Sequence, residues 1–234
     1  MEFSDEELLL MKPGDYVLSL LNSVPVDRRT IVLMRHSARN SFEGIPEELR
    51  EGVEITPEGV SMAKAFGKSL SEIASRENLF LGHTAARRCR MTAESIGEGY
   101  SPASRVRLLG CQPEIESPVV NPDKYVALRD ELGWREGIRR WLDEEIPADT
   151  LCNPHSYSED ILEKLLSCPV IGKNNLLFVV AHDITIIPII SNVFGKRITA
   201  VEFLNGIVIT VNETTAEIRY SDVENSLKTE RDIE

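Results

Sequence analysis

Short apolar runs that end in polar residues constrain the fold of this chain more than any other feature. Residues 30–35 and 176–181 are rich in Val, Leu and Ile, and the second run contains no polar residue. A continuous apolar run of this length is typical of a β-strand that is buried on both faces. Such strands occur in parallel sheets covered by helices, and the sequence therefore predicts an α/β fold.

Helix signals separate the predicted strands. Thr56 followed by Pro57 predicts a helix that continues to about Arg76, because Thr is a good N-cap and Pro fits the first helical turn. The other predicted elements are a strand at 79–81, a helix at about 86–97, a strand at 106–109, a helix at about 185–194, and a hairpin of residues 206–211 and 216–220. This alternation predicts a mainly parallel sheet flanked by helices.

One domain is expected to account for most of the chain. The 234 residues suffice for a single large core, and we expect an α/β domain at 29–222. Residues 1–28 are expected to form a helical extension packed on this domain, with a short helix that opens at Ser4 and a second from Asp15 to Asn22. The remaining predicted parts are a mostly helical insertion over the sheet edge at about 112–170 and a polar C-terminal tail at 223–234.

Charge and composition narrow the range of partners. The formal net charge of −12 disfavours long-range attraction to nucleic acid or to an anionic membrane. No apolar run reaches about 18 residues, so no membrane span is expected. The acidic amino terminus lacks the basic start of a secretory signal, and the four cysteines lack zinc-ligand spacing. We therefore expect a cytoplasmic protein with reduced thiols and without a metal or cofactor, while a disulfide stays open because pairing depends on geometry.

The first predicted strand delivers an unusual group of residues to the sheet edge. It ends in Arg35-His36-Ser37-Ala38-Arg39, an imidazole between two guanidiniums. Nearby positive charge disfavours a protonated imidazole and keeps it neutral and nucleophilic. Guanidiniums also present several coplanar donors that suit phosphate. The segment therefore predicts an anion site, which the acidic surface does not forbid, because charges beyond about 8 Å are largely screened at physiological salt.

Two other strand ends carry residues of the same kind. The strand at 79–81 is followed by His83, Thr84 and Arg88, and the strand at 176–181 is followed by His182 and Asp183. Ligands of open α/β sheets bind outside the carboxyl ends of the strands. We therefore expect the three strand ends to meet around one ligand.

These segments resemble the motifs of the histidine phosphatase superfamily, which includes phosphoglycerate mutases, bacterial phosphohistidine phosphatases and histidine acid phosphatases. The residues that carry the resemblance are Arg35-His36-Ser37-Ala38-Arg39 for Arg-His-Gly-x-Arg, Ile55-Thr56-Pro57-Glu58-Gly59 for Leu-Thr-x-x-Gly, Thr84-x-x-x-Arg88-x-x-x-Thr92-Ala93 for Ser-x-x-x-Arg-x-x-x-Thr-Ala, and Ala181-His182-Asp183 for the His-Asp motif of the acid phosphatase branch. The match covers roughly residues 30–211 in the family's order and implies a phosphoglycerate mutase-like fold.

The resemblance implies a phosphomonoester hydrolase that acts through a phosphohistidine intermediate on His36. It also implies that the phosphoryl oxygens are held by Arg35, Arg39, Arg88 and His182. The chemistry of these residues agrees, since fixed cations stabilise the charge that phosphoryl transfer spreads over three oxygens. A covalent step also divides a difficult hydrolysis into two displacements.

Two carboxyl groups compete for the role of general acid. Asp183 is preferred by analogy with the acid phosphatase branch. Asp130 lies in a segment, residues 128–137, that faintly resembles the mutase branch, in which a glutamate is the acid. Ser37 departs from the family's Gly, and it would be strained if the position required a positive φ or a close approach to phosphate, although its hydroxyl could donate to the ligand instead.

Several alternatives stay open at this level. A phosphomutase of the same fold and a non-catalytic phospho-ligand binding protein are the rival functions. The expected partner is a phosphorylated small molecule, with a phosphoprotein less favoured, and the physiological substrate and oligomeric state are not predicted. Among other residues, Cys89 is interpreted as a structural thiol or one with a lowered pKa, and Trp134 and Trp141, seven residues apart, as core residues or walls of a cleft.

Overall fold

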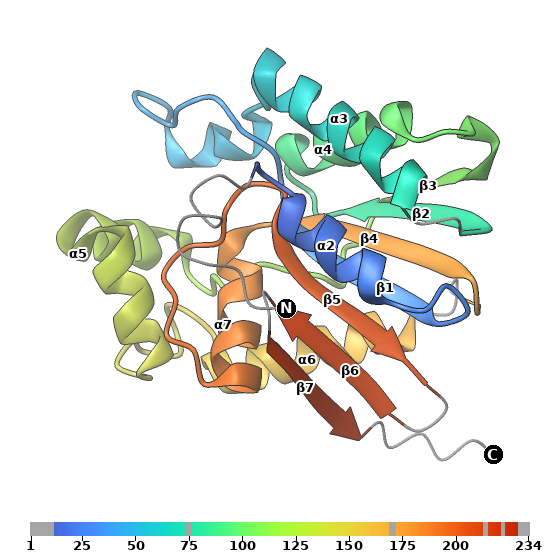
Figure 1. Ribbon diagram of the computed structural model, residues 1–234. Coiled ribbons are helices and arrows are strands. Elements are labelled where there is room, and N and C mark those ends of the chain that lie inside the picture. The colour runs from blue at the N-terminus through green and yellow to red at the C-terminus, as the bar shows by residue number, and fades with distance from the viewer. Residues whose placement is uncertain (1–11, 74–75, 169–171, 213–214, 221–222, 229–234) are drawn as a thin grey trace.

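The computed structural model describes residues 12–73, 76–168, 172–212, 215–220 and 223–228, and is built around one seven-stranded sheet (Figure 1). The order of the strands in the sheet is β3-β2-β4-β1-β5-β6-β7. Their bounds are β1 Arg29–Arg35, β2 Asn78–His83, β3 Val106–Cys111, β4 Asn175–Ala181, β5 Gly206–Val211, β6 Thr215–Tyr220 and β7 Val223–Lys228. The helix expected to open at Ser4 lies outside the described residues.

The strands divide into a parallel half and an antiparallel half. β4 lies between β1 and β2 and runs parallel to both, and β3 continues the parallel half beyond β2. β5, β6 and β7 are added on the other side of β1, each antiparallel to its neighbour. The expected α/β fold with buried parallel strands is confirmed. The predicted polar tail at 223–234 needs correction, because residues 223–228 extend the sheet as β7.

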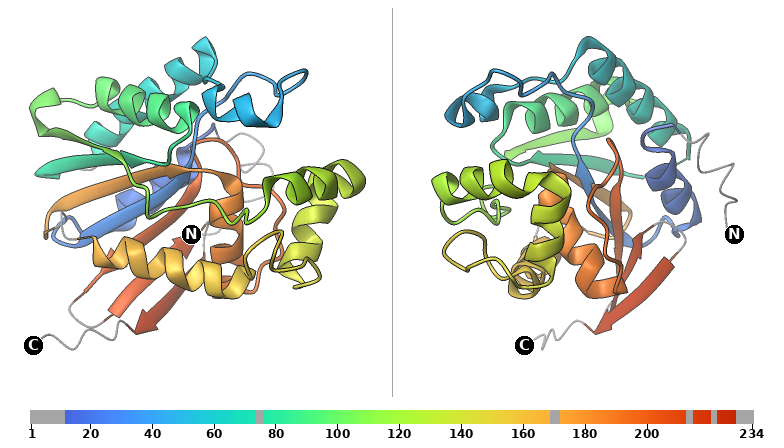
Figure 2. Two further views of the ribbon diagram at one scale, coloured as in Figure 1. Left: turned by 180° about the vertical axis from the view of Figure 1, so that it is seen from behind. Right: turned by 90° about the vertical axis from the view of Figure 1, so that its left-hand side faces the viewer.

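Helices cover both faces of the sheet (Figures 1 and 2). Successive residues of β1 point to opposite faces, so that Ile31 and Leu33 join one core cluster and Val32 and Met34 join the other. The first face is covered by α5 (Pro122–Leu142), α6 (Pro154–Ser167) and α7 (Asp183–Phe194), and the second by α2 (Asp15–Ser23), α3 (Pro57–Ile73) and α4 (Arg87–Gly99). Two 3-10 segments, η1 (Glu47–Gly52) and η2 (Ala103–Arg105), complete these elements.

The insertion at 112–170 does more than overhang the sheet edge. α6 buries Ile161 and Leu165 in the core of the first face, where they share a cluster with strand residues, and only α5 extends beyond the sheet. Gly133, with φ 73° and ψ 169°, breaks α5 into two arms. This positive φ suits glycine, since other residues rarely adopt it.

The described part of the segment before β1 packs on the domain. α2 buries Val17 and Leu21 in the core of the second face. α3 ends at Ile73 and not at Arg76, and Arg76 is a buried residue whose guanidinium donates to the carbonyls of Pro25 and Arg28, each at 3.1 Å. Among the helices described, none is both long enough and apolar enough to cross a membrane.

Candidate active site

The carboxyl ends of β1, β4 and β2 bring the predicted site residues together. Because β4 lies between the other two strands, the N–H of His36 donates to the carbonyl of Ala181 at 3.0 Å, and the N–H of Thr84 donates to Val180 at 3.0 Å. His182 follows β4 directly, and its ring centroid lies 5.5 Å from that of His36. The sheet register thus gathers three strand ends from distant parts of the sequence around one point.

His36 is buried, with 3% of its surface exposed. Its Nδ1 lies 2.7 Å from the carbonyl oxygen of Ser37. A carbonyl only accepts hydrogen bonds, so Nδ1 carries the proton and Nε2 keeps its lone pair. The pKa of His36 is lowered to about 3, chiefly by burial; the hydrogen bond to Ser37 opposes this shift, and the charges of the neighbouring arginines add to it. The imidazole is therefore neutral at physiological pH.

Arg35 and Asp183 form one wall of this site. Nη1 of Arg35 donates to the carbonyl of Val201, and Nη2 lies 3.3 Å from Oδ2 of Asp183. The guanidinium also lies over the ring of Phe203, 4.4 Å from its centroid. Asp183 is in the first turn of α7, where its Oδ1 accepts a hydrogen bond from the N–H of Ile184 at 3.0 Å. Its carboxylate thus accepts a hydrogen bond at the start of α7 and also pairs with Arg35.

Arg88 and Arg39 form the opposite wall. Nη1 of Arg88 donates to the carbonyl of Arg50 at 2.8 Å, and its Nη2 lies 3.4 Å from Nδ1 of His182. Arg39 donates to the carbonyl of Asn40 and stacks on the ring of Phe42 at 3.3 Å. Burial and, to a smaller extent, the positive charges of the neighbouring arginines lower the pKa of Arg39 to about 10.

The arginines crowd together with little negative charge among them. Within the described part of the chain, the Nε atoms of Arg35 and Arg88 are buried and have no hydrogen-bond partner. A buried donor without a partner is costly, and cations that depress one another's pKa are stabilised by an anion. The geometry therefore suits a group with several anionic oxygens.

His182 is the second histidine of the site. Burial lowers its pKa well below the ordinary value, and the nearby charge of Arg88 and the neighbouring His36 contribute. Its Nε2 lies 3.5 Å from Oγ1 of Thr84. The thiol of Cys89 lies beside the ring, and burial raises its pKa to about 12. The possibility of a lowered pKa at Cys89 is therefore wrong, and the thiol donates to the carbonyl of Ala181.

Ser37 does not behave as a strained substitute for glycine. Its φ is not positive, so the backbone has no need of glycine there. Its N–H donates to Oγ1 of Thr92 at 3.0 Å, and its hydroxyl donates to the carbonyl of Gly59 at 2.8 Å. The sequence left two alternatives open at this position, backbone strain or a hydroxyl that donates to the ligand. In the structure Ser37 instead ties the loop after β1 to α3 and α4.

Gly59 permits this close packing. A Cβ at position 59 would lie 2.1 Å from the carbonyl oxygen of Ala38, well inside van der Waals contact. The same carbonyl accepts a hydrogen bond from the N–H of Thr56 at 2.9 Å, and Oγ1 of Thr56 in turn accepts from the N–H of Gly59. The predicted helix start at Thr56 is therefore confirmed, and it anchors the loop that carries His36.

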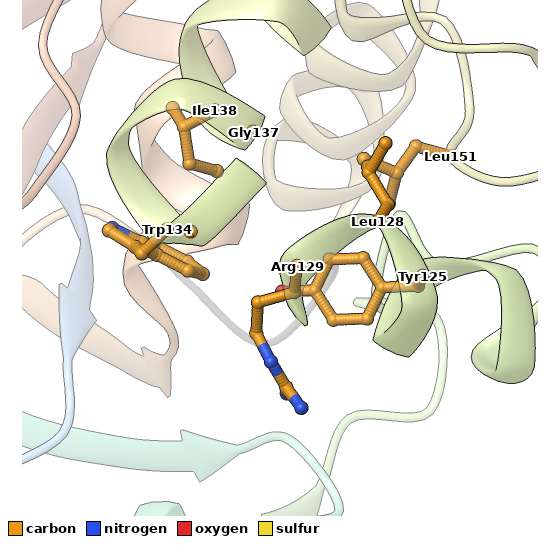
Figure 3. A pocket seen from close by; sticks show the side chains of 8 residues that line it. Tyr125, Leu128, Arg129, Trp134, Gly137, Ile138 and Leu151 are labelled. Atoms are coloured by element: carbon orange, nitrogen blue, oxygen red, sulfur yellow. The ribbon is translucent and has the colours of Figure 1, made fainter. Parts of the chain in front are cut away.

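Other residues considered in the sequence analysis lie outside the group around His36 or were not predicted. The side chain of Asp130 is 69% exposed and pairs with Arg129. Trp141 belongs to the core, as predicted, whereas Trp134 lines a narrow crevice between the two arms of α5 and donates to the carbonyl of Thr199 (Figure 3). Phe42, Arg50 and Phe203 were missed, because they belong to irregular segments without a periodic pattern. No cluster of three or more His, Cys, Asp or Glu side chains that could hold a metal ion occurs among the residues described.

Comparison of the sequence with models of protein families gave no match, and comparison with curated proteins gave none either. Solved structures are similar. Phosphoglycerate mutase from Bacillus anthracis matches with a TM-score of 0.54 at 15% identity, over 87% of this chain and 94% of that one. The alpha-ribazole phosphatase from Shigella flexneri gives 0.53 at 15% identity, over 83% of this chain and 96% of that one. A protein assigned as the phosphohistidine phosphatase SixA from Agrobacterium tumefaciens gives 0.50 at 14%, over 88% of this chain and 100% of that one.

These three proteins belong to the superfamily whose motifs the sequence resembles. At such identities the similarity establishes the fold. The phosphoglycerate mutase-like fold that the motifs implied is therefore confirmed.

Proposed function

We propose that this protein is a phosphomonoester hydrolase of the histidine phosphatase superfamily that acts through a phosphohistidine intermediate on His36. The observation that carries the proposal is a neutral imidazole whose Nδ1 proton is held by the carbonyl of Ser37, which leaves Nε2 free beside a cluster of arginines. A nucleophile needs a free electron pair, and a phosphoryl group needs fixed cations. The imidazole and the arginines that support the proposal lie together at one edge of the sheet.

The first half of the reaction would transfer the phosphoryl group to the enzyme. The nonbridging oxygens would be held by Arg35, Arg39, Arg88 and His182. The lone pair of His36 Nε2 would attack phosphorus, and the bond to the ester oxygen would break. The leaving oxygen would take a proton from Asp183, whose carboxyl group lies beside Arg35 at the same site.

The second half would return His36 to its free state. Water would attack the phosphohistidine and give a proton to Asp183, while the P–N bond breaks and its electron pair returns to Nε2. The products are inorganic phosphate and the enzyme in its starting form. The preferred substrate is a phosphorylated small molecule.

The two rival functions gain no support from the geometry. A non-catalytic phosphate-binding protein was motivated by Ser37 and by the amino-terminal helices; the φ of Ser37 is not positive, and α2 packs in the core of the second face. The mutase-like acid, Asp130, is exposed on α5.

Turnover of an aryl phosphate by purified variants tests the proposal. His36→Ala is expected to abolish phosphate release, since it removes the proposed nucleophile. His155→Ala is the matched control, because His155 is an exposed histidine of α6 and should leave turnover unchanged. Phosphate release by His36→Ala at the rate of the control would refute the proposed function.

A further inference from the structure

One carboxylate oxygen joins two arginines from opposite sides of the sheet. Oε2 of Glu47, in η1, lies 2.5 Å from Nη1 of Arg50 and 2.9 Å from Nη1 of Arg129 in α5. η1 packs on α4, and α5 packs on α7, so these elements belong to the layers on the two faces of the sheet (Figure 2). The contact between Glu47 and Arg129 therefore links the two layers beyond the strand ends that carry the candidate site.

Arg50 connects the Glu47 ion pairs to Arg88, one of the residues proposed to bind phosphate. The carbonyl of Arg50 accepts the hydrogen bond from Nη1 of Arg88, and the guanidiniums of Arg50 and Arg88 lie 5.2 and 5.3 Å from the centroid of the Phe42 ring. The side chain of Arg50 also donates from Nε to the carbonyl of Ile45. The contacts of the Arg50 side chain with Glu47 and Ile45 therefore help to fix the position of the Arg50 carbonyl.

The two ion pairs of Glu47 are less exposed to solvent than ordinary surface ion pairs. The side chains of Arg50, Arg129 and Glu47 are 21%, 22% and 34% exposed, and two donors share one oxygen. Burial alone would lower the pKa of Arg129, but the hydrogen bond and charge of Glu47 raise it above its ordinary value. Isolated exposed pairs contribute little, whereas networks with restricted geometry hold elements in register.

We propose that Glu47 is a positioning residue, which ties the insertion helix α5 to η1 and thereby holds the Arg50 carbonyl that orients Arg88. The inference rests on the proposed function, because it assigns Glu47 an effect on the phosphoryl oxygens that Arg88 is expected to bind. It also gives the insertion an indirect effect on phosphate binding. Glu47 itself touches neither His36 nor the substrate in this account.

Glu47→Gln is the first test, with Glu48→Gln as the matched control. Glu48 is the next residue of η1 and is exposed, so its removal costs the same charge without the link to Arg129. In Glu47→Gln, the KM for an aryl phosphate and the inhibition constant of orthophosphate are expected to rise together by about tenfold, since a small displacement of a binding group has effects of this order. The pH profile of kcat should not change, and Glu48→Gln should match the wild type.

A double-mutant cycle separates this role from a merely structural one. Arg88→Lys retains a positive charge, but it cannot contact the Arg50 carbonyl and His182 together. In this background, Glu47→Gln should change the inhibition constant of orthophosphate by less than about a further twofold. A purely structural role would instead give a full tenfold effect in both backgrounds. Full additivity, or a Glu47→Gln protein indistinguishable from Glu48→Gln, would overturn the inference.

The outcomes also separate this inference from the proposed function. A wild-type protein that neither turns over aryl phosphate nor binds orthophosphate by calorimetry contradicts the proposed function, and the inference with it. A wild-type protein that does both, with Glu47→Gln unaffected, contradicts the inference alone.

Discussion

The buried neutral state of His36 predicts a specific dependence of stability on pH. In the unfolded chain this histidine has an ordinary pKa of 6.5, whereas in the folded protein its pKa is about 3. Between pH 3 and pH 6.5, the unfolded state therefore binds a proton at His36 and the folded state does not. The associated stability is fully present above pH 6.5 and is lost as the pH falls from 6.5 towards 3.

The size of the effect follows from the two pKa values. At pH 4.5, the two-unit difference from 6.5 corresponds to about 2.7 kcal/mol of lost stability, and at pH 7 the loss is only about 0.2 kcal/mol. The wild type should therefore lose roughly 2.5 kcal/mol between pH 7 and pH 4.5 through His36 alone. His182, whose pKa is also lowered, adds a loss in the same direction.

The comparison of wild type with His36→Asn isolates this contribution. The Asn amide nitrogen can replace Nδ1 as donor to the carbonyl of Ser37, but it does not titrate. Free energies of unfolding are measured in urea at pH 7 and pH 4.5, with His155→Asn as an exposed control. The wild type and the control should lose about 2.5 kcal/mol more than His36→Asn. Equal losses in all three proteins would show that His36 is not held neutral by burial.

Three substitutions test other parts of the site. Gly59→Ala places a Cβ 2.1 Å from the carbonyl oxygen of Ala38 and should cost about 1–3 kcal/mol in urea unfolding, while Gly137→Ala, with open space around it, should not destabilise the protein. Ser37→Gly removes the hydroxyl donor to Gly59 and should lower stability by about 1 kcal/mol without raising kcat; a large gain in kcat would contradict its structural role. Asp183→Asn should lower kcat/KM for alkyl phosphates by about a hundredfold and kcat/KM for aryl phosphates with good leaving groups far less, because kcat/KM reports transfer to His36 and only poor leaving groups need the proton in that step. Asp130→Asn should leave the turnover of both substrate classes unchanged. If Asp130→Asn instead slowed the alkyl phosphates and Asp183→Asn did not, Asp130 would be the general acid.

The strand ends could be predicted because their signals are local. The apolar runs before His36 and His182 identify buried strands, and parallel strands place their carboxyl ends on one edge. The convergence of Arg35, Arg88 and Asp183 then follows from the topology. The helix start at Thr56 was equally accessible, since the capping residues are adjacent in the sequence.

Features that depend on contacts between distant segments could not be predicted. Glu47 and Arg129 are 82 residues apart, and nothing in the sequence pairs them. The unstrained state of Ser37 depends on the carbonyl of Gly59, which only the packing of α3 brings near. β7 is too polar to be distinguished from a tail, because its strand character arises from pairing with β6.

Rapid quenching with a ³²P-labelled phosphate ester tests the central claim most directly. A phosphohistidine is stable in base and labile in acid, so the quenched protein should carry a base-stable label that maps to His36 by peptide mass spectrometry. The label should appear before inorganic phosphate is released, and it should be absent from His36→Ala but present in His155→Ala. Steady release of phosphate from the wild type without any labelled protein, or with the label on another residue, would contradict the account.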